Sequence, residues 1–79
     1  MALTTNRQLR AARAMLGWDQ RQLAEVSDVS NVTIGKMEQA EGILRGRHET
    51  VQKLQRALEA AGVEFKPDGS VRLREAADA

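Results

Sequence analysis

Few side chains of this 79-residue chain belong to the types that perform catalysis or hold metal ions. The chain has no cysteine, and no nucleophile motif surrounds its single histidine, His48. We therefore expect no catalytic residue, no metal site and no cofactor, and the sequence gives no support for an enzyme. The side chains that can still do chemistry are mainly cations, which attract phosphate.

The placement of these cations is more informative than the net charge. Twelve Lys and Arg against eleven Asp and Glu give a net charge of only +1, whereas many nucleic-acid-binding proteins are far more basic. Residues 1–47 nevertheless hold seven basic residues against five acidic ones. The seven are Arg7, Arg10, Arg13, Arg21, Lys36, Arg45 and Arg47. Any attraction to phosphate must therefore come from local placement in this part of the chain.

Capping residues and hydrophobic spacing predict four short helices, which must pack on one another to be stable. The predicted helices cover residues 6–16, about 20–27, 31–39 and about 51–61. Their predicted N-caps are Thr5, Asp19, Ser30 and Thr50. Gly17 and Gly62 follow the first and the last helix, at positions where glycine commonly ends a helix.

A helix, a three-residue turn and a second helix, together spanning about residues 19–38, form the most informative pattern in the chain. Such a unit needs apolar side chains at its inward-facing positions and a small one where the two helices cross. The residues at these positions are Leu23, Ala24, Val29, Ile34 and Met37. All five requirements are met at once.

This stretch resembles the helix-turn-helix of the phage repressor/Cro-like (XRE) family of transcription regulators. The resemblance rests on Arg13-Ala14-Met15-Leu16-Gly17-Trp18-Asp19-Gln20, Gln20-Arg21-Gln22-Leu23-Ala24, Val29-Ser30-Asn31-Val32-Thr33-Ile34 and Lys36-Met37-Glu38. It covers about residues 6–61 and implies a mainly α fold, with a compact four-helix repressor-like domain over residues 1–62. Two positions depart from the family pattern: Asp28 stands where glycine is usual, and Ser27 where a small apolar residue is usual.

The resemblance also implies roles for particular residues. The helix over residues 31–39 would lie in the major groove of double-stranded DNA, with base contacts from Asn31, Val32, Thr33 and Lys36. Phosphate contacts are expected from Gln20 and Ser30. Arg45 and Arg47, in the loop after this helix, are expected to contact the phosphate backbone or the adjacent minor groove. Arg13 would form a structural ion pair with Glu38, which locks the recognition helix in place.

We expect from this a transcription repressor that binds a palindromic operator as a homodimer. Two alternatives stay open: an antitoxin that also binds a toxin or another protein partner such as an antiactivator, and a protein–protein adaptor that has lost DNA binding. Because few residues follow Gly62, we expect no small-molecule effector domain. No secretory signal and no membrane-spanning run is visible, so we expect a soluble, cytoplasmic protein.

A second period begins after Gly62, where apolar and polar residues alternate on both sides of Pro67-Asp68-Gly69. This pattern predicts a β-hairpin over residues 63–74, followed by a frayed tail over residues 75–79. An isolated hairpin is only marginally stable in water, so it needs a partner surface. We expect it to form the dimer interface, through Val63, Phe65, Val71 and Leu73. The alternative is that it folds back onto its own helices.

Overall fold

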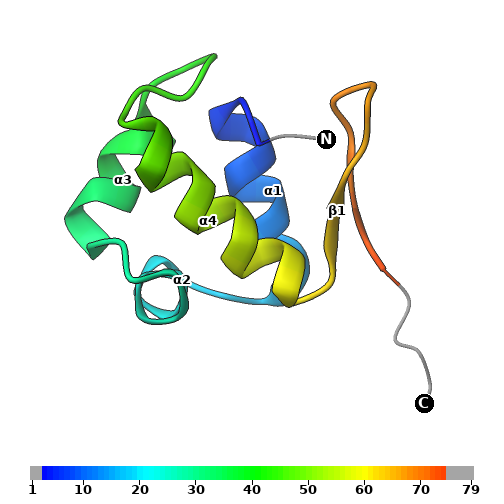
Figure 1. Cartoon of the computed structure of the whole chain (residues 1–79), viewed down its shortest axis with the longest axis horizontal. Coiled ribbons are helices and arrows are strands. Elements are labelled where there is room, and N and C mark those ends of the chain that lie inside the picture. The colour runs from blue at the N-terminus through cyan, green and yellow to red at the C-terminus, as the bar shows by residue number, and fades with distance from the viewer. Residues whose placement is uncertain (1–2, 75–79) are drawn as a thin grey trace.

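The computed structural model describes residues 3–74, which form four helices and a two-stranded antiparallel sheet (Figure 1). The helices are α1 (Asn6–Leu16), α2 (Gln20–Ser27), α3 (Asn31–Gln39) and α4 (His48–Ala60), and the strands are β1 (Val63–Phe65) and β2 (Val71–Leu73). The predicted mainly helical fold with a C-terminal hairpin is confirmed. The tail predicted over residues 75–79 lies outside the described residues. None of the described helices is long and apolar enough to cross a membrane.

The first three helices begin at the predicted caps. The Thr5 hydroxyl accepts a hydrogen bond from the Gln8 backbone N–H at 3.1 Å, and the Gln8 side chain accepts one from the Thr5 N–H at 3.0 Å. Asp19 and Gln22 form the same reciprocal pair at the start of α2, with distances of 2.8 and 2.9 Å. Ser30 caps α3 in a simpler way, without the return bond. These side chains satisfy backbone donors that would otherwise have no partner within the helix.

The predicted N-cap of the fourth helix is wrong. α4 begins at His48, three positions before the start that Thr50 would give, and its N-cap is Arg47. Arg47 makes no side-chain capping hydrogen bond, but its backbone is extended, and its carbonyl accepts from the Val51 N–H at 3.1 Å. A helix can therefore start here without a hydroxyl residue. Thr50 lies inside the first turn.

One apolar core holds the helices and the hairpin together. α2 packs against α3 and α4, α1 packs against α3 and β2, and α4 packs against β1. The core consists of Leu3, Leu9, Ala12, Leu23, Val29, Ile34, Met37, Leu44, Leu54, Leu58, Val63 and Phe65. Because every element contributes to the same core, the position of α3 is fixed by the whole domain.

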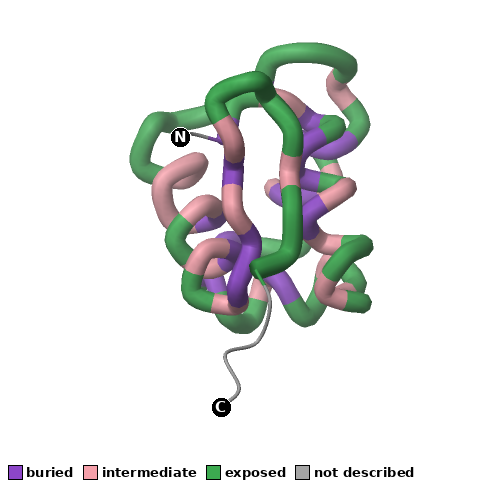
Figure 2. Tube along the Cα trace, turned by 90° about the vertical axis from the view of Figure 1, so that its right-hand side faces the viewer, coloured by how far each residue is buried: buried purple, intermediate pink, exposed green. Residues whose placement is uncertain are grey.

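The hairpin folds back onto its own helices, which was the alternative to a dimer interface. Seen from the hairpin side (Figure 2), β1 alternates buried and half-buried residues, whereas β2 is largely exposed. Val63 is 1% exposed and Phe65 5% exposed. These two side chains fill the chain's own core, so the prediction that they contact a second copy is corrected. Val71 packs partly against the same core, and Leu73 remains 44% exposed.

Two contacts fix the hairpin to the helices and shape its turn. The Gln8 side-chain amide donates to the Gly69 carbonyl at 3.1 Å, which ties the turn to α1. In the turn itself, the Asp68 carboxylate accepts from the Ser70 N–H at 2.9 Å and from its hydroxyl at 2.6 Å. These hydrogen bonds from Ser70 lower the pKa of the Asp68 carboxyl below its ordinary value. The hairpin therefore has a defined turn and is attached to α1.

Candidate nucleic-acid interface

α3 is buried on one side and exposed on the other. Ile34 is fully buried and Met37 is 4% exposed, so these side chains anchor the helix in the core. Asn31, Val32 and Lys36 are exposed, Val32 to 68%. Of the four predicted base-contact residues, the structure thus places these three in solvent on the same short helix. Their side chains offer an amide, an apolar branch and a cation.

The fourth predicted base-contact residue, Thr33, is half-buried and bonded to the cap of its own helix. The Ser30 hydroxyl donates to the Thr33 hydroxyl oxygen at 2.8 Å and accepts from the Thr33 N–H at 3.1 Å. The two hydroxyls are therefore held together in the first turn of α3. The free backbone N–H groups of that turn and the helix dipole favour an anion at this position.

A buried carboxylate connects α3 to α1 and α2. Arg13 donates to Glu38 through Nε and Nη2, both at 2.8 Å, and through Nη1 to the Trp18 carbonyl at 2.9 Å. The hydrogen bonds to Glu38 raise the pKa of the Arg13 guanidinium above its ordinary value. Gln20 adds a third donor to the carboxylate, from Nε2 to Glu38 Oε1 at 3.0 Å. The network fixes the angle between the three helices.

The Gln20 contact is a role that sequence reasoning missed. Gln20 was expected only to bind phosphate, but the structure engages one of its two amide N–H donors with Glu38. The two residues are 18 positions apart, and no local pattern signals such a contact. The second amide N–H has no partner among the described residues.

A shallow groove separates the start of α2 from the start of α3. It is lined by Arg13, Asp19, Gln20, Arg21 and Asn31. Arg21 was not predicted as a site residue, although it is one of the seven cations in residues 1–47 and directly follows Gln20. It is exposed, so the groove combines a free cation with the amide of Asn31. This is the chemistry that phosphate and base edges require.

The chain matches the sequence model of a helix-turn-helix family, of the XRE or Cro/C1 type, over residues 9–65. The match begins within α1 and ends with β1, so it includes α2, the turn, α3 and the hydrogen-bond network around Glu38. The chain belongs to this family. It is a DNA-binding transcription regulator, and its family is not one of enzymes. The comparisons with curated proteins and with solved structures give no match.

The helix-turn-helix domain accommodates its two unusual turn residues by local hydrogen bonding. Asp28 adopts a left-handed backbone with φ 64°, and its N–H donates to the Ala24 carbonyl at 3.0 Å. Asp tolerates this conformation better than most residues that carry a side chain. Ser27 is buried, and its hydroxyl accepts from the Val29 N–H at 3.2 Å. The buried hydroxyl therefore has a partner, and the turn keeps its shape.

The loop after α3 carries the other two predicted phosphate contacts, Arg45 and Arg47, which are both exposed. Asn6, fully buried, holds this loop in place. Its side-chain amide donates to the Glu38 carbonyl at 3.2 Å, and its side-chain oxygen accepts from the Gly42 N–H at 3.0 Å. The loop that carries the two arginines follows the C-terminal end of α3, whereas Ser30 precedes the start of that helix.

The remaining predicted site residues lie elsewhere. The four hairpin residues are at the opposite end of the helix-turn-helix domain from α3 (Figure 1). Residues 3–74 contain no group of three acidic or histidine side chains that could hold a metal ion. The surface around α3 is thus the one to which the predicted DNA contacts converge.

Proposed function

We propose that this regulator is a repressor that binds a palindromic operator as a homodimer, with α3 in the major groove. The observation that carries the proposal is that α3 is buried on one side and exposed on the other. Ile34 and Met37 anchor one side in the core. The other side exposes Asn31, Val32 and Lys36 on a helix whose orientation is fixed by Glu38.

The exposed side chains have the chemistry for reading base edges. An asparagine amide pairs in two places with adenine N6 and N7, and a lysine donates to guanine O6 and N7. An apolar branch contacts the methyl group of thymine. Asn31, Lys36 and Val32 supply one of each, and Thr33 adds a second methyl group. Together they can distinguish a few neighbouring base pairs.

The phosphate candidates are spaced to match the walls of the groove. Ser30 precedes α3 and Arg21 lines the groove beside Asn31 at its start, whereas Arg45 and Arg47 follow its end. α3 has nine residues, which at 1.5 Å per residue gives a length of about 13 Å. The major groove is about 12 Å wide. One set of contacts can therefore meet each of the two backbones that border the groove.

Homodimerisation and repression follow from what one domain can do. A single recognition helix reads too few base pairs to specify a site, whereas two copies related by a two-fold axis read a palindrome. A dimer bound to a promoter excludes other proteins from that DNA by occupancy alone. Repression therefore needs no activity beyond the interface described above.

Selection of bound duplexes from a random DNA pool, at low and at physiological salt, tests this function. The proposal predicts that one inverted repeat is enriched at both salt concentrations. Binding that falls steeply with salt and enriches no sequence would contradict it, because that is the behaviour of non-specific backbone contact. A complete lack of DNA binding at low salt would support an adaptor instead.

A further inference from the structure

We propose that Ile43, in the loop between α3 and α4, packs against the deoxyribose edge of the minor groove and makes DNA binding depend on the base pairs that flank those read by α3. The inference rests on the proposed function, in which α3 lies in the major groove. It adds an apolar contact to a loop from which only arginines were expected to contact DNA.

Ile43 is held away from the core although it is apolar. It is the most exposed large apolar side chain of residues 3–74, at 75%. Leu44, which follows it, is buried at 9% exposure, and Arg45 is exposed again. This alternation is that of an extended segment, in which successive side chains point to opposite sides. Ile43 and Arg45 therefore point outward on the same side, about 7 Å apart along the backbone.

The loop fixes the position of Ile43 through backbone hydrogen bonds on both sides. The Leu44 N–H donates to the Thr4 carbonyl at 2.8 Å. Before Ile43, the Gly42 carbonyl accepts from the Asn6 N–H at 3.0 Å. Both contacts join the loop to the start of α1. A side chain on such a held backbone loses little freedom on binding, which favours a contact made by Ile43.

The charges around Ile43 favour DNA as its partner. Arg45 and Arg47 are exposed, and neither forms an ion pair with any residue in the range 3–74. Glu41, the one acidic residue of the loop, borders a hollow together with Arg7. Cations without acidic partners attract the phosphate backbone, and an apolar side chain beside them meets the sugars of the same strand.

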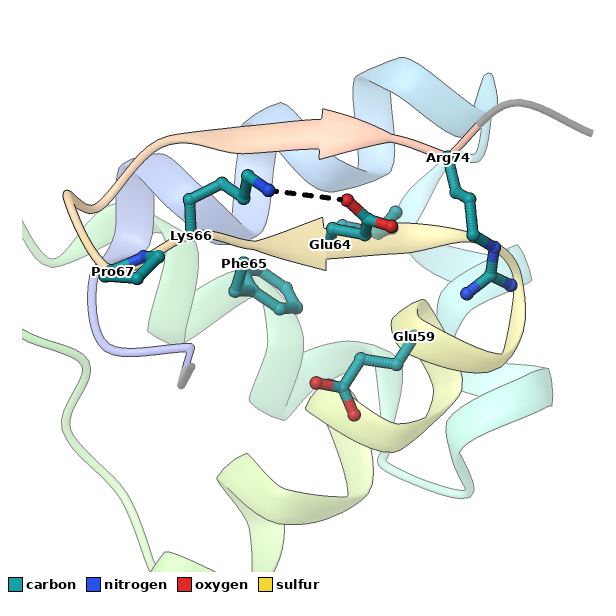
Figure 3. Close-up of a pocket in the computed structure, with 7 residues that line it drawn as sticks. Glu59, Glu64, Phe65, Lys66, Pro67 and Arg74 are labelled. Atoms are coloured by element: carbon teal, nitrogen blue, oxygen red, sulfur yellow. Dashed lines mark ion pairs between the residues drawn. The ribbon is translucent and has the colours of Figure 1, made fainter.

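The cations of the hairpin differ in this respect. Lys66 contacts Glu64 at 3.8 Å (Figure 3), and Arg72 approaches the same carboxylate at 3.5 Å. Figure 3 also shows Arg74 turned toward the part of α4 that carries Glu59. Acidic and basic side chains therefore lie close together around β1. The loop after α3, and not the hairpin, offers unpaired cations beside an exposed apolar side chain.

The place of the loop in the proposed complex determines what Ile43 meets. α3 is about as long as the major groove is wide, so the loop after its end meets one of the two bordering backbones. The minor groove lies on the far side of that backbone. An apolar side chain there is accommodated best at base steps that unstack easily, such as TA and CA/TG. Ile43 therefore reads the deformability of the flanking DNA.

Selection of bound duplexes by the parent chain and by Ile43→Ala tests the inference. The parent should enrich pyrimidine–purine steps beside the inverted repeat. Ile43→Ala should enrich the same repeat without these flanking steps and bind the parent's best duplex several-fold more weakly. Its urea unfolding midpoint should not change, because the side chain is exposed. Unchanged flanking steps with unchanged affinity would overturn the inference.

Two further variants serve as controls for this selection. Val26→Ala truncates another exposed branched side chain, on α2, and should select the same DNA as the parent. Ile43→Lys should strengthen binding to every duplex and steepen the salt slope by about one, as an added phosphate contact does. It should not restore the flanking preference. A lysine variant that keeps the parent's preference would contradict an apolar contact.

Photo-cross-linking measures the contact without relying on selection. The chain has no cysteine, so Ile43→Cys and Val26→Cys each take a single benzophenone maleimide label. On irradiation with duplex DNA at low salt, the label at position 43 should join to DNA and the label at position 26 should not. If the parent selects an inverted repeat but position 43 joins only to protein or to nothing, the inference fails and the proposed function stands. Cross-linking to DNA without a selected repeat would instead refute the proposed function and leave the contact.

Discussion

Glu38 is the one acidic side chain that residues 3–74 bury, at 4% exposure. A carboxylate in this position is costly unless its charge is matched and its oxygens are hydrogen-bonded. Arg13 supplies two donors and Gln20 a third. The contact connects α1 and α2 to α3, so this one carboxylate joins three helices.

Arg13→Ala should therefore be strongly destabilising. It leaves Glu38 buried with only the Gln20 amide as a side-chain partner, and we expect unfolding to require about 3 kcal/mol less, near the lower end of the cost of an unpaired buried charge. Urea denaturation of the variant measures this. Arg10→Ala, an exposed arginine on the same helix, should change stability by less than about 0.5 kcal/mol. Equal effects at the two positions would show that the pair does not stabilise the domain.

The Arg13 guanidinium should not make stability depend on pH near neutrality. The pKa of Arg13 is raised on folding, chiefly by its hydrogen bonds to Glu38. A raised pKa of a cation gives stability that is complete below its unfolded value and is lost only as the pH rises through the folded value. For a guanidinium this window is strongly alkaline.

At the scale of the elements, the turn between α2 and α3 is the point of backbone strain. Asp28 is the one residue other than glycine with a positive φ among residues 3–74. Asp28→Gly should stabilise the domain by up to about 1 kcal/mol, because glycine has no penalty in the left-handed region. Asp28→Ala should destabilise it by about 1 kcal/mol. Thermal or urea unfolding would give the order, and a glycine variant less stable than the alanine variant would contradict the account of the turn.

The elements also show what the sequence can and cannot predict. Helices that start with a side-chain cap, at Thr5, Asp19 and Ser30, were predicted to the residue. α4 was not, because Arg47 caps it through the backbone alone. Side-chain caps mark the first three starts in the sequence, whereas the fourth has no such marker.

The same division applies to the site. The residues on the exposed side of α3 follow from the helical pattern and the family resemblance. Asn6 does not, because its partners at Glu38 and Gly42 are 32 and 36 positions away. The inward packing of Val63 and Phe65 was equally hidden, since alternation shows that one face of a hairpin is apolar but not which surface covers it.

At the scale of the whole molecule, α3 and the hairpin lie at opposite ends of the longest axis, which measures 35 Å (Figure 1). Successive major grooves on one side of the duplex lie about 34 Å apart. A homodimer that places one α3 in each of two such grooves reads half-sites centred about 10 base pairs apart, arranged as an inverted repeat. Footprinting on the selected DNA measures the spacing, and a direct repeat would contradict a two-fold dimer.

The central claim is that Asn31 on α3 reads a base while Arg45 only holds the backbone. The decisive measurement is the affinity of each alanine variant for the selected duplex and for a shuffled duplex of the same composition. Asn31→Ala should weaken binding to the selected duplex by about 5- to 150-fold and leave the shuffled duplex unaffected. Arg45→Ala should weaken both equally and reduce the salt slope by about one. If Asn31→Ala changes both affinities by the same factor, α3 is not the element that reads the sequence.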